Sequence, residues 1–286
     1  MIGYSLMLWP WLSTRETPEM TGATLFTEQW GSGPPVAFVH GLGASARYWQ
    51  RVRDASTGYR GVAPDLLGFG RSPAPPDAAY DVDTHLDALA PVVPAGSLVV
   101  GHSTGGLLAA ALAARRSDLV RRLLLIGLPA FPDERTARVE VGRLGLLARL
   151  TVTGSPLARL VCTAMCELRP LAIAVAPLVI RDLPPSIASD AARHTWPSYH
   201  RTLERVVAYR PHDDLATAPA AVTFLHGSDD RTAPPKYVCR LVDDLTAERK
   251  DIDLRLVPGD HHLAVRRPEQ VAEIITKLVA APEATR

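Results

Sequence analysis

The sequence predicts an α/β fold, with a mostly parallel, doubly wound sheet and a helical segment inserted into it. Three observations lead to this prediction. Short apolar runs bounded by Gly and Pro recur along the chain, and helix-like stretches separate several of them. Residues 130–215 lack such runs and are rich in proline. Because strands that alternate with helices are typical of parallel sheets covered on both faces, the two flanking parts are expected to form one sheet.

The predicted elements follow the chain in order. Apolar runs indicate strands at 36–40, 61–64, 98–101, 123–127, 222–226 and 254–257. Helical periodicity indicates helices at 104–116, 235–245 and 268–280 in the flanking parts, and at 137–149 and 189–209 within the insertion. These assignments give a core of residues 22–129 and 216–286 and a helical cap of residues 130–215.

Residues 1–21 are expected to form an N-terminal extension outside the core. Residues 1–12 read MIGYSLMLWPWL. A membrane span needs about 20 apolar residues, so this run is too short, and it also contains Pro10. A signal peptide typically has a basic segment and a cleavage site of small residues, and neither is clearly recognisable in this run. We expect a cytoplasmic protein without stable membrane insertion, while weak membrane association through residues 1–12 stays open.

Composition restricts the classes of partner. The 286 residues carry 31 Lys+Arg against 30 Asp+Glu, a formal net charge of +1, which does not indicate a nucleic-acid binder. The three cysteines (Cys162, Cys166 and Cys239) form no CxxC motif, so neither a disulfide framework nor a zinc site is predicted. The expected partner is a small molecule, with no metal or organic cofactor.

A nucleophile motif lies between the strand at 98–101 and the helix at 104–116. It reads Gly101-His102-Ser103-Thr104-Gly105, and this strand–turn–helix context is the one that a nucleophile elbow requires. Ser103 would sit in a strained turn between small residues, with the N-terminus of the following helix directed at developing negative charge. The pattern alone is weak evidence, because short Gly-Ser-Gly motifs also arise by chance.

Acid and base candidates follow two later strands, in the chain order that such a nucleophile needs. The strand at 222–226 is followed by Asp229 and Asp230, and the strand at 254–257 is followed by His261 and His262. Each thus lies at the carboxyl end of a strand, where ligands bind in open α/β sheets. From position alone, either member of each pair could serve.

These motifs resemble those of the α/β-hydrolase superfamily, in particular its esterase- and lipase-like members. The acid loop of that family commonly reads Gly-x-x-Asp-x-x-x-Pro, matched here by Gly227, Asp230 and Pro234. Its histidine loop commonly reads Gly-x-His before a Pro-Glu pair, matched by Gly259, His261 and residues 268–269. The resemblance therefore favours Asp230 and His261 as the partners of Ser103.

The resemblance also implies an oxyanion site. His40-Gly41 resembles the family's His-Gly motif, which places one backbone donor at Leu42, and the other donor is the amide of Thr104. A further match, residues 64–72 (PDLLGFGRS), is interpreted as structural.

The implied activity is hydrolysis of a carboxylic ester or a related acyl bond, such as a thioester or lactone, through an acyl-enzyme. The alternatives are a member that cleaves carbon–carbon bonds or is otherwise non-hydrolytic, and a receptor-like binder with slow or no turnover. His40, His102, Trp196 and Tyr199, with the nearby His194 and His200, are candidate pocket or cap residues. The cap also carries many aliphatic residues, which either indicate an apolar substrate or pack the cap onto the core. They are Leu144, Leu146, Leu147, Leu171, Ile173, Val175, Leu178 and Ile180.

Overall fold

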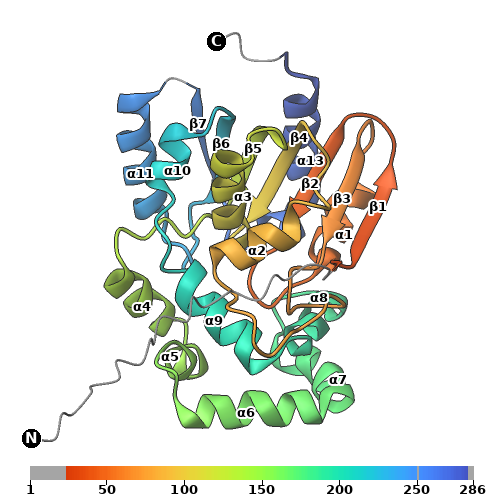
Figure 1. Cartoon of the computed structure of the whole chain (residues 1–286), viewed down its shortest axis with the longest axis vertical. Helices are drawn as coiled ribbons and strands as arrows, with labels where there is room; N and C mark the ends of the chain where they lie inside the picture. The colour runs from red at the N-terminus through yellow and green to blue at the C-terminus, as the bar shows by residue number, and fades with distance from the viewer. Residues whose placement is uncertain (1–23, 250, 283–286) are drawn as a thin grey trace, which may run out of the picture.

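A computed structural model describes residues 24–249 and 251–282, and a seven-stranded sheet forms its centre (Figure 1). The strand order is β1-β3-β2-β4-β5-β6-β7, and every pairing except that of β1 with β3 is parallel. The predicted extension of residues 1–21 lies outside the described residues. The strands are β1 Thr27–Gly31, β2 Pro35–Val39, β3 Arg60–Pro64, β4 Ser97–His102, β5 Val120–Ile126, β6 Ala221–Gly227 and β7 Ile252–Val257.

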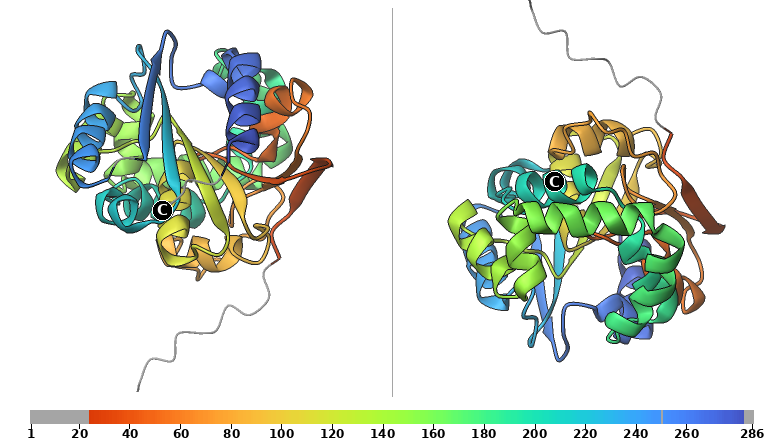
Figure 2. Two further views of the ribbon diagram at one scale, coloured as in Figure 1. Left: turned by 90° about the horizontal axis from the view of Figure 1, so that it is seen from above. Right: turned by 90° about the horizontal axis from the view of Figure 1, so that it is seen from below.

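Helices cover both faces of the sheet (Figure 2, left). They are η1 Ala46–Trp49, α1 Gln50–Asp54, α2 Val82–Leu89, α3 Thr104–Arg115, α10 His212–Thr217, α11 Pro235–Glu248, α12 Leu263–Arg266 and α13 Pro268–Ala280. Successive residues of a strand point to opposite faces. Accordingly, Val99 packs in the core with α2, α3 and α11, whereas Leu98 and Val100 pack in the core with α1 and α13. The predicted fold class is confirmed.

The strand β1 was not predicted from the sequence. It reads TEQWG, has no alternation of apolar and polar residues, and pairs antiparallel with β3 at the edge of the sheet. Its position is fixed by the ladder to β3 and by Trp30, whose ring lies 5.1 Å from that of Phe38. A Cβ on Gly61 would lie 2.2 Å from the Trp30 ring, so a glycine is required beneath this indole.

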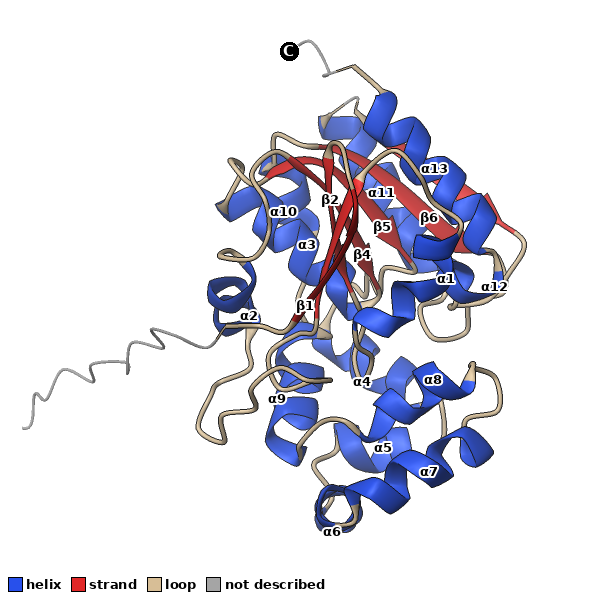
Figure 3. Ribbon diagram, turned by 90° about the vertical axis from the view of Figure 1, so that its right-hand side faces the viewer, coloured by secondary structure: helices blue, strands red, loops and turns tan. Residues whose placement is uncertain are grey.

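Only helices and turns, with one isolated bridge, connect β5 to β6 in the described chain, and most of them gather at one end of the sheet (Figure 3). They are α4 Glu134–Gly142, α5 Leu146–Val152, α6 Pro156–Glu167, α7 Arg169–Val179, α8 Pro185–Ala188, η2 Ser189–Ala192 and α9 Trp196–Val206, followed by α10. We call residues 134–206 the helical insertion. The boundary predicted at 215 falls inside α10, whose Leu215 packs in the same core as α3.

Two predicted helices of the insertion are wrong as single elements. The expected helix at 137–149 is two helices, α4 and α5, which are separated at Gly145 with a φ of +140°. The expected helix at 189–209 is the short η2 followed by α9, because Thr195 adopts an extended conformation and caps α9 through Ser198. Both breaks are local backbone events, and the helical periodicity on either side conceals them.

The helix α9 joins the insertion to the core. Ser198 donates to the carbonyl of Gly68 over 2.9 Å, and His85 of α2 lies 3.0 Å from the hydroxyl of Thr202. Gly68 has a φ of +83°, and a Cβ there would lie 2.3 Å from the Ser198 side chain. The loop after β3 therefore needs this glycine both for its turn and for the close approach of α9.

Candidate active site

Ser103 occupies a strained turn between β4 and α3. Its φ of 53° and ψ of −123° lie in a region that residues with a side chain rarely adopt. The flanking glycines permit this turn: a Cβ on Gly101 would lie 2.6 Å from the Gly105 carbonyl, and one on Gly105 would lie 2.3 Å from the Val39 carbonyl. The geometry thus explains why small residues surround Ser103.

Asp230 and His261 form a buried pair at the ends of β6 and β7. The distance from His261 Nδ1 to Asp230 Oδ2 is 2.8 Å. The other carboxylate oxygen of Asp230 accepts hydrogen bonds from the amides of Thr232 and Ala233, at 2.9 and 2.7 Å. Burial acts to raise the pKa of Asp230, but the hydrogen bond and charge of His261, together with the Ala233 amide, hold it below its ordinary value. Asp230 is therefore an anion at neutral pH.

The neighbours of this pair point elsewhere. Asp229 is exposed and accepts from Ser228, and His262 packs near the rings of Tyr48 and His102. Burial and the adjacent His261 lower the pKa of His262 to about 4. Of the two acids and two histidines that the sequence offered, the structure brings Asp230 and His261 together.

The hydrogen bonds indicate which nitrogen of His261 carries its proton. An ionised carboxylate can only accept, so Nδ1 of His261 donates to Asp230. In the neutral ring, Nε2 then keeps a lone pair. This tautomer can accept a proton from a serine hydroxyl.

His102 supports the loop that carries His261. Its Nε2 lies 2.9 Å from the carbonyl oxygen of His261, to which it donates, and its ring stacks on Tyr48 with centroids 4.4 Å apart. Burial, with the nearby imidazoles of His261 and His262, lowers the pKa of His102 well below the usual value. His102 is thus a neutral, buried group beside the pair.

Gly127 and His226 also contact the pair, and the sequence analysis missed both. A Cβ on Gly127, whose φ is +59°, would lie 3.1 Å from His261 Nδ1 and 3.4 Å from Asp230 Oδ2. His226 Nε2 donates to the carbonyl of Ala233 over 2.6 Å and lies 3.4 Å from Asp230 Oδ2. Their position at the ends of β5 and β6 was the only available signal, since sheet order decides which loops meet.

The loop after β2 lies against Ser103. Parallel pairing places Val39 beside Gly101, and a Cβ on Gly41 would lie 3.1 Å from the Cβ of Ser103. Leu42 follows directly in this loop and is partly buried. Thr104 is the first residue of α3, where backbone amides have no acceptor within the helix.

His40 lies beneath this loop, and both ring nitrogens bind backbone groups. Nδ1 donates to the carbonyl of Gly41 over 2.8 Å, and Nε2 accepts from the amide of Leu66 over 2.9 Å. Burial lowers the pKa of His40. A neutral His40 therefore joins the loop after β2 to the loop after β3.

The loop of residues 64–72 is organised around the buried carboxylate of Asp65. This group accepts from the amide of Ala46 over 2.6 Å and from the amide and Nε of Arg71, each over 2.9 Å. The hydroxyl of Ser72 donates to the carbonyl of Asp65. Burial acts to raise the pKa of Asp65, but the bonds from Arg71 and Ala46 lower it overall.

The insertion contributes aromatic residues above the loop after β2. A Cβ on Gly43 would lie 3.3 Å from the ring of Tyr199, whose centroid is 4.6 Å from that of His194. Trp196 instead stacks on His200, with centroids 4.6 Å apart. Tyr199 therefore contacts the loop that carries Leu42, whereas Trp196 stacks on a residue of the insertion itself.

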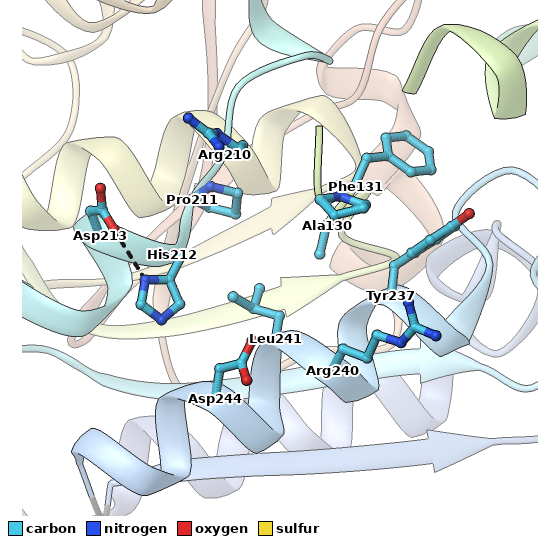
Figure 4. A pocket seen from close by; sticks show the side chains of 11 residues that line it. Ala130, Phe131, Arg210, Pro211, His212, Asp213, Tyr237, Arg240, Leu241 and Asp244 are labelled. Atoms are coloured by element: carbon cyan, nitrogen blue, oxygen red, sulfur yellow. Dashed lines mark hydrogen bonds and ion pairs between the residues drawn. The ribbon is translucent and has the colours of Figure 1, made fainter. Parts of the chain in front are cut away.

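Among the described residues, no group of three or more His, Cys, Asp or Glu side chains is placed to hold a metal ion. Cys162 is 3.8 Å from Nδ1 of His194, and burial and the neighbouring Cys166 raise the pKa of its thiol to about 12. A separate hollow of about 390 Å³ lies between α10, α11 and residues 130–132, and includes Arg210, His212 and Arg240 in its lining (Figure 4). It shares no residue with the Ser103 region.

The sheet, the strained serine and the Asp230–His261 pair at the ends of successive strands have the arrangement typical of α/β hydrolases. A family model described as "Alpha/beta hydrolase family" matches residues 36–274. The chain belongs to this family.

Several named proteins are similar to this chain. A probable lysophospholipase of Arabidopsis thaliana, BODYGUARD 4, is 30% identical over 268 residues, which cover 83% of this chain and 62% of that protein. A 2-hydroxymuconate semialdehyde hydrolase of a Pseudomonas strain is 39% identical over 105 residues, or 34% of this chain and 37% of that one. The chain thus spans less than two thirds of these relatives.

Solved structures share the fold. An esterase from Exiguobacterium antarcticum superposes with a TM-score of 0.71 at 18% sequence identity, covering 92% of this chain and 97% of that one.

Proposed function

We propose that this protein is a serine hydrolase that cleaves carboxylic esters or related acyl bonds. The observation that carries the proposal is the buried Asp230–His261 pair, 2.8 Å apart, at the strand ends next to Ser103. The amide of Ser103, whose φ is 53°, donates to the carbonyl of Ile126, and the Cβ position of the next residue, Gly127, lies 3.1 Å from His261 Nδ1. Family membership supports ester hydrolysis, as does the similarity to a probable lysophospholipase. The role of each residue follows from general acid–base chemistry.

Ser103 is the nucleophile. His261 Nε2 takes the hydroxyl proton as Ser103 Oγ attacks the acyl carbon, and Asp230 stabilises the resulting imidazolium. The tetrahedral oxyanion accepts hydrogen bonds from the amides of Leu42 and Thr104. Collapse of this intermediate expels the alcohol, which receives the proton from His261. Water, deprotonated by the same nitrogen, then attacks the acyl-serine and releases the acid.

The acyl group of the substrate is proposed to be uncharged and apolar. The support is local: Leu42 and the ring of Tyr199 flank Gly43, beside the proposed oxyanion donors. His40 and His102, which the sequence suggested for the pocket, are buried and bonded to backbone groups, so we assign them positioning roles.

Two measurements test the proposal. A fluorophosphonate probe should modify Ser103, as read by peptide mass spectrometry, and should leave the Ser103→Ala variant unlabelled. A panel of p-nitrophenyl esters, acyl thioesters and lactones of rising chain length should then identify the bond and acyl group. If the folded protein stays unlabelled while a reference serine hydrolase is labelled in the same experiment, the serine-hydrolase function is excluded and a ligand-binding role is favoured.

A second candidate is hydrolysis of a carbon–carbon bond. The observation in its favour is the local similarity to 2-hydroxymuconate semialdehyde hydrolase. The same serine, histidine and acid serve both reactions. The test substrate is a vinylogous 1,5-diketone, whose turnover is measured as loss of its visible absorbance. Turnover of this compound, without turnover of any ester in the panel, would favour this candidate over the first.

A further inference from the structure

The outer surface of the helical insertion is unusually apolar. Among the described residues, thirteen large apolar side chains are exposed, and eight of them lie between Pro156 and Val179. Their exposed fractions range from 39% to 74%. They are Leu157, Leu160, Val161, Leu168, Leu171, Val175, Leu178 and Val179. Several of these are the aliphatic residues that the sequence suggested for a pocket or for cap packing, and the structure places them at the surface instead.

The pattern on α7 is regular. Its exposed positions are 170, 171, 174, 175, 178 and 179, which form one helical face, and every residue on that face is apolar. The opposite face carries Ala176, which is buried. On α6 the buried residues are Ala158 and Cys162, and the exposed leucines lie on the far side of the helix. Both helices thus direct an apolar stripe away from the protein.

The two helices lie at one end of the molecule, beyond α9 (Figure 1; Figure 2, right). Within the described residues, no single helix is both long and apolar enough to cross a membrane. The axes of α6 and α7 meet at a bend of 114°. We call their outer side chains, the eight named above, the apolar face.

Arginines outnumber acidic residues in the segment that carries the apolar face. From 145 to 182 the chain contains four arginines, at 149, 159, 169 and 181, and two acidic residues, Glu167 and Asp182. Arg149, Arg159 and Arg181 are exposed, and no acidic side chain of the described residues lies within ion-pair distance of them. Elsewhere in the insertion, Arg138 and Arg143 are paired with Glu134 and Glu140.

We propose that the apolar face docks the protein on an anionic lipid surface. Leucine and valine side chains enter the boundary between headgroups and acyl chains, and the unpaired arginines bind lipid phosphates. A second copy of the chain fits this face less well. In a two-fold dimer the same surface meets itself, so the unpaired arginines of one copy would lie near those of the other. The proposal is independent of ester hydrolysis, because the apolar face contains no residue of the candidate active site.

The test is co-sedimentation of the full chain with sucrose-loaded vesicles. Vesicles of equal parts phosphatidylglycerol and phosphatidylcholine should bind the protein, and vesicles of phosphatidylcholine alone should bind it more weakly. The double variant Leu171→Ser, Leu178→Ser should lose about tenfold or more in affinity for the anionic vesicles, because it lacks two leucine side chains that would be transferred from water into the lipid. The double variant Arg149→Gln, Arg159→Gln should lose the preference for the anionic vesicles.

Control variants test whether vesicle binding depends on the apolar face in particular. Leu256→Ser removes a leucine that is 50% exposed on β7, at the opposite edge of the sheet from β1, and should bind as the unaltered chain does. Trp9→Ser with Trp11→Ser tests residues 1–12, the segment considered from the sequence alone, and should also leave binding unchanged. Far-ultraviolet circular dichroism and hydrolysis of a soluble ester verify that each variant is folded.

Three results would overturn the proposal. One is absence of binding to anionic vesicles, and another is full binding by the Leu171→Ser, Leu178→Ser variant. The third is a dimer in sedimentation velocity that this variant abolishes, which would assign the apolar face to a second copy.

Discussion

Ser45 donates a 2.5 Å hydrogen bond to Asp190, and this bond joins the loop after β2 to the helical insertion. The next amide, that of Ala46, donates to Asp65 over 2.6 Å. Two buried carboxylates, one from each part of the chain, therefore hold the residues that follow Leu42. Burial raises the pKa of Asp190, despite the bond from Ser45 and the charges of Arg47 and Arg193. The position of the insertion is thus coupled to the proposed oxyanion loop.

Removal of this bond should impair both folding and catalysis. Ser45→Ala leaves the buried carboxylate of Asp190 short of a donor, at a cost of about 1–3 kcal/mol in the free energy of unfolding. We also expect kcat to fall more than KM rises. The variant would displace the loop that carries Leu42, and the amide of Leu42 is proposed to bind the oxyanion, which forms only as the reaction proceeds. Urea denaturation and steady-state kinetics measure the two effects. Ser189→Ala, which removes a bond to Ile173 within the insertion, should leave kcat unchanged. Additive effects of Ser45→Ala and Asp190→Asn would mean that the two residues are not coupled.

Replacement of the acid should separate Asp230 from its neighbour. Asp230→Asn removes the charge that stabilises the His261 imidazolium, and we expect kcat to fall by on the order of 10⁴. Asp229→Asn is the matched control, since Asp229 is one residue away and exposed. Its activity on a p-nitrophenyl ester should be within about twofold of the unaltered enzyme. Equal losses in both variants would contradict the assignment.

Gly127→Ala should damage the site beyond its effect on stability. The new Cβ would meet His261 Nδ1 at 3.1 Å, and the residue would also be strained at a φ of +59°. Gly96→Ala isolates the strain, because Gly96 has a φ of +67° and nothing within 4 Å of its Cβ position. Both variants should lose about 1–2 kcal/mol of stability, and only Gly127→Ala should lose kcat. If the folded Gly127→Ala variant has unchanged kinetics, His261 and Asp230 do not lie against Gly127 as the structure places them.

Acid should unfold this protein through its buried histidines. Burial lowers the pKa values of His85 and His194 to about 4, and that of His262 to about 4 as well. An unfolded histidine titrates near 6.5, so the unfolded state binds more protons between these values. The free energy of unfolding should therefore be constant above pH 6.5 and fall as the pH decreases toward 4.

His85 offers a direct test of this linkage. The lowered pKa of His85 changes the free energy of unfolding by on the order of 3 kcal/mol between pH 6.5 and pH 4. His85→Gln keeps a polar group opposite Thr202 but does not titrate. Urea denaturation at pH 7 and at pH 5 should show a smaller difference for His85→Gln than for the unaltered chain. An equal difference in the two proteins would assign the acid sensitivity to other groups.

The sequence determined the fold class and the order of the chemistry-bearing loops. Buried parallel strands are nearly continuous apolar runs, so β2 to β6 were predictable, together with α3, α11 and α13. The edge strand β7 was also predicted, from its shorter apolar run at 254–257, although none of its residues is fully buried. The glycines around Ser103 and the acid and histidine loops were visible for the same reason: each needs particular residue types at short spacing. Helix breaks at Gly145 and Thr195 were not predictable, because they depend on single backbone angles inside regions of continuous helical character.

The tertiary structure decided what depends on contact between distant segments. Adjacent side chains such as Asp229 and Asp230 are equivalent by position, and only the turn after β6 directs one of them to His261. The edge strand β1 exists because β3 pairs with it, and Asp190 meets Ser45 across 145 residues of chain. The aliphatic residues of the insertion were equally ambiguous, since periodicity shows that a helix has an apolar face but not whether that face meets protein. In α7 it points outward, because the opposite face packs on the insertion and leaves the leucines without protein neighbours to cover them.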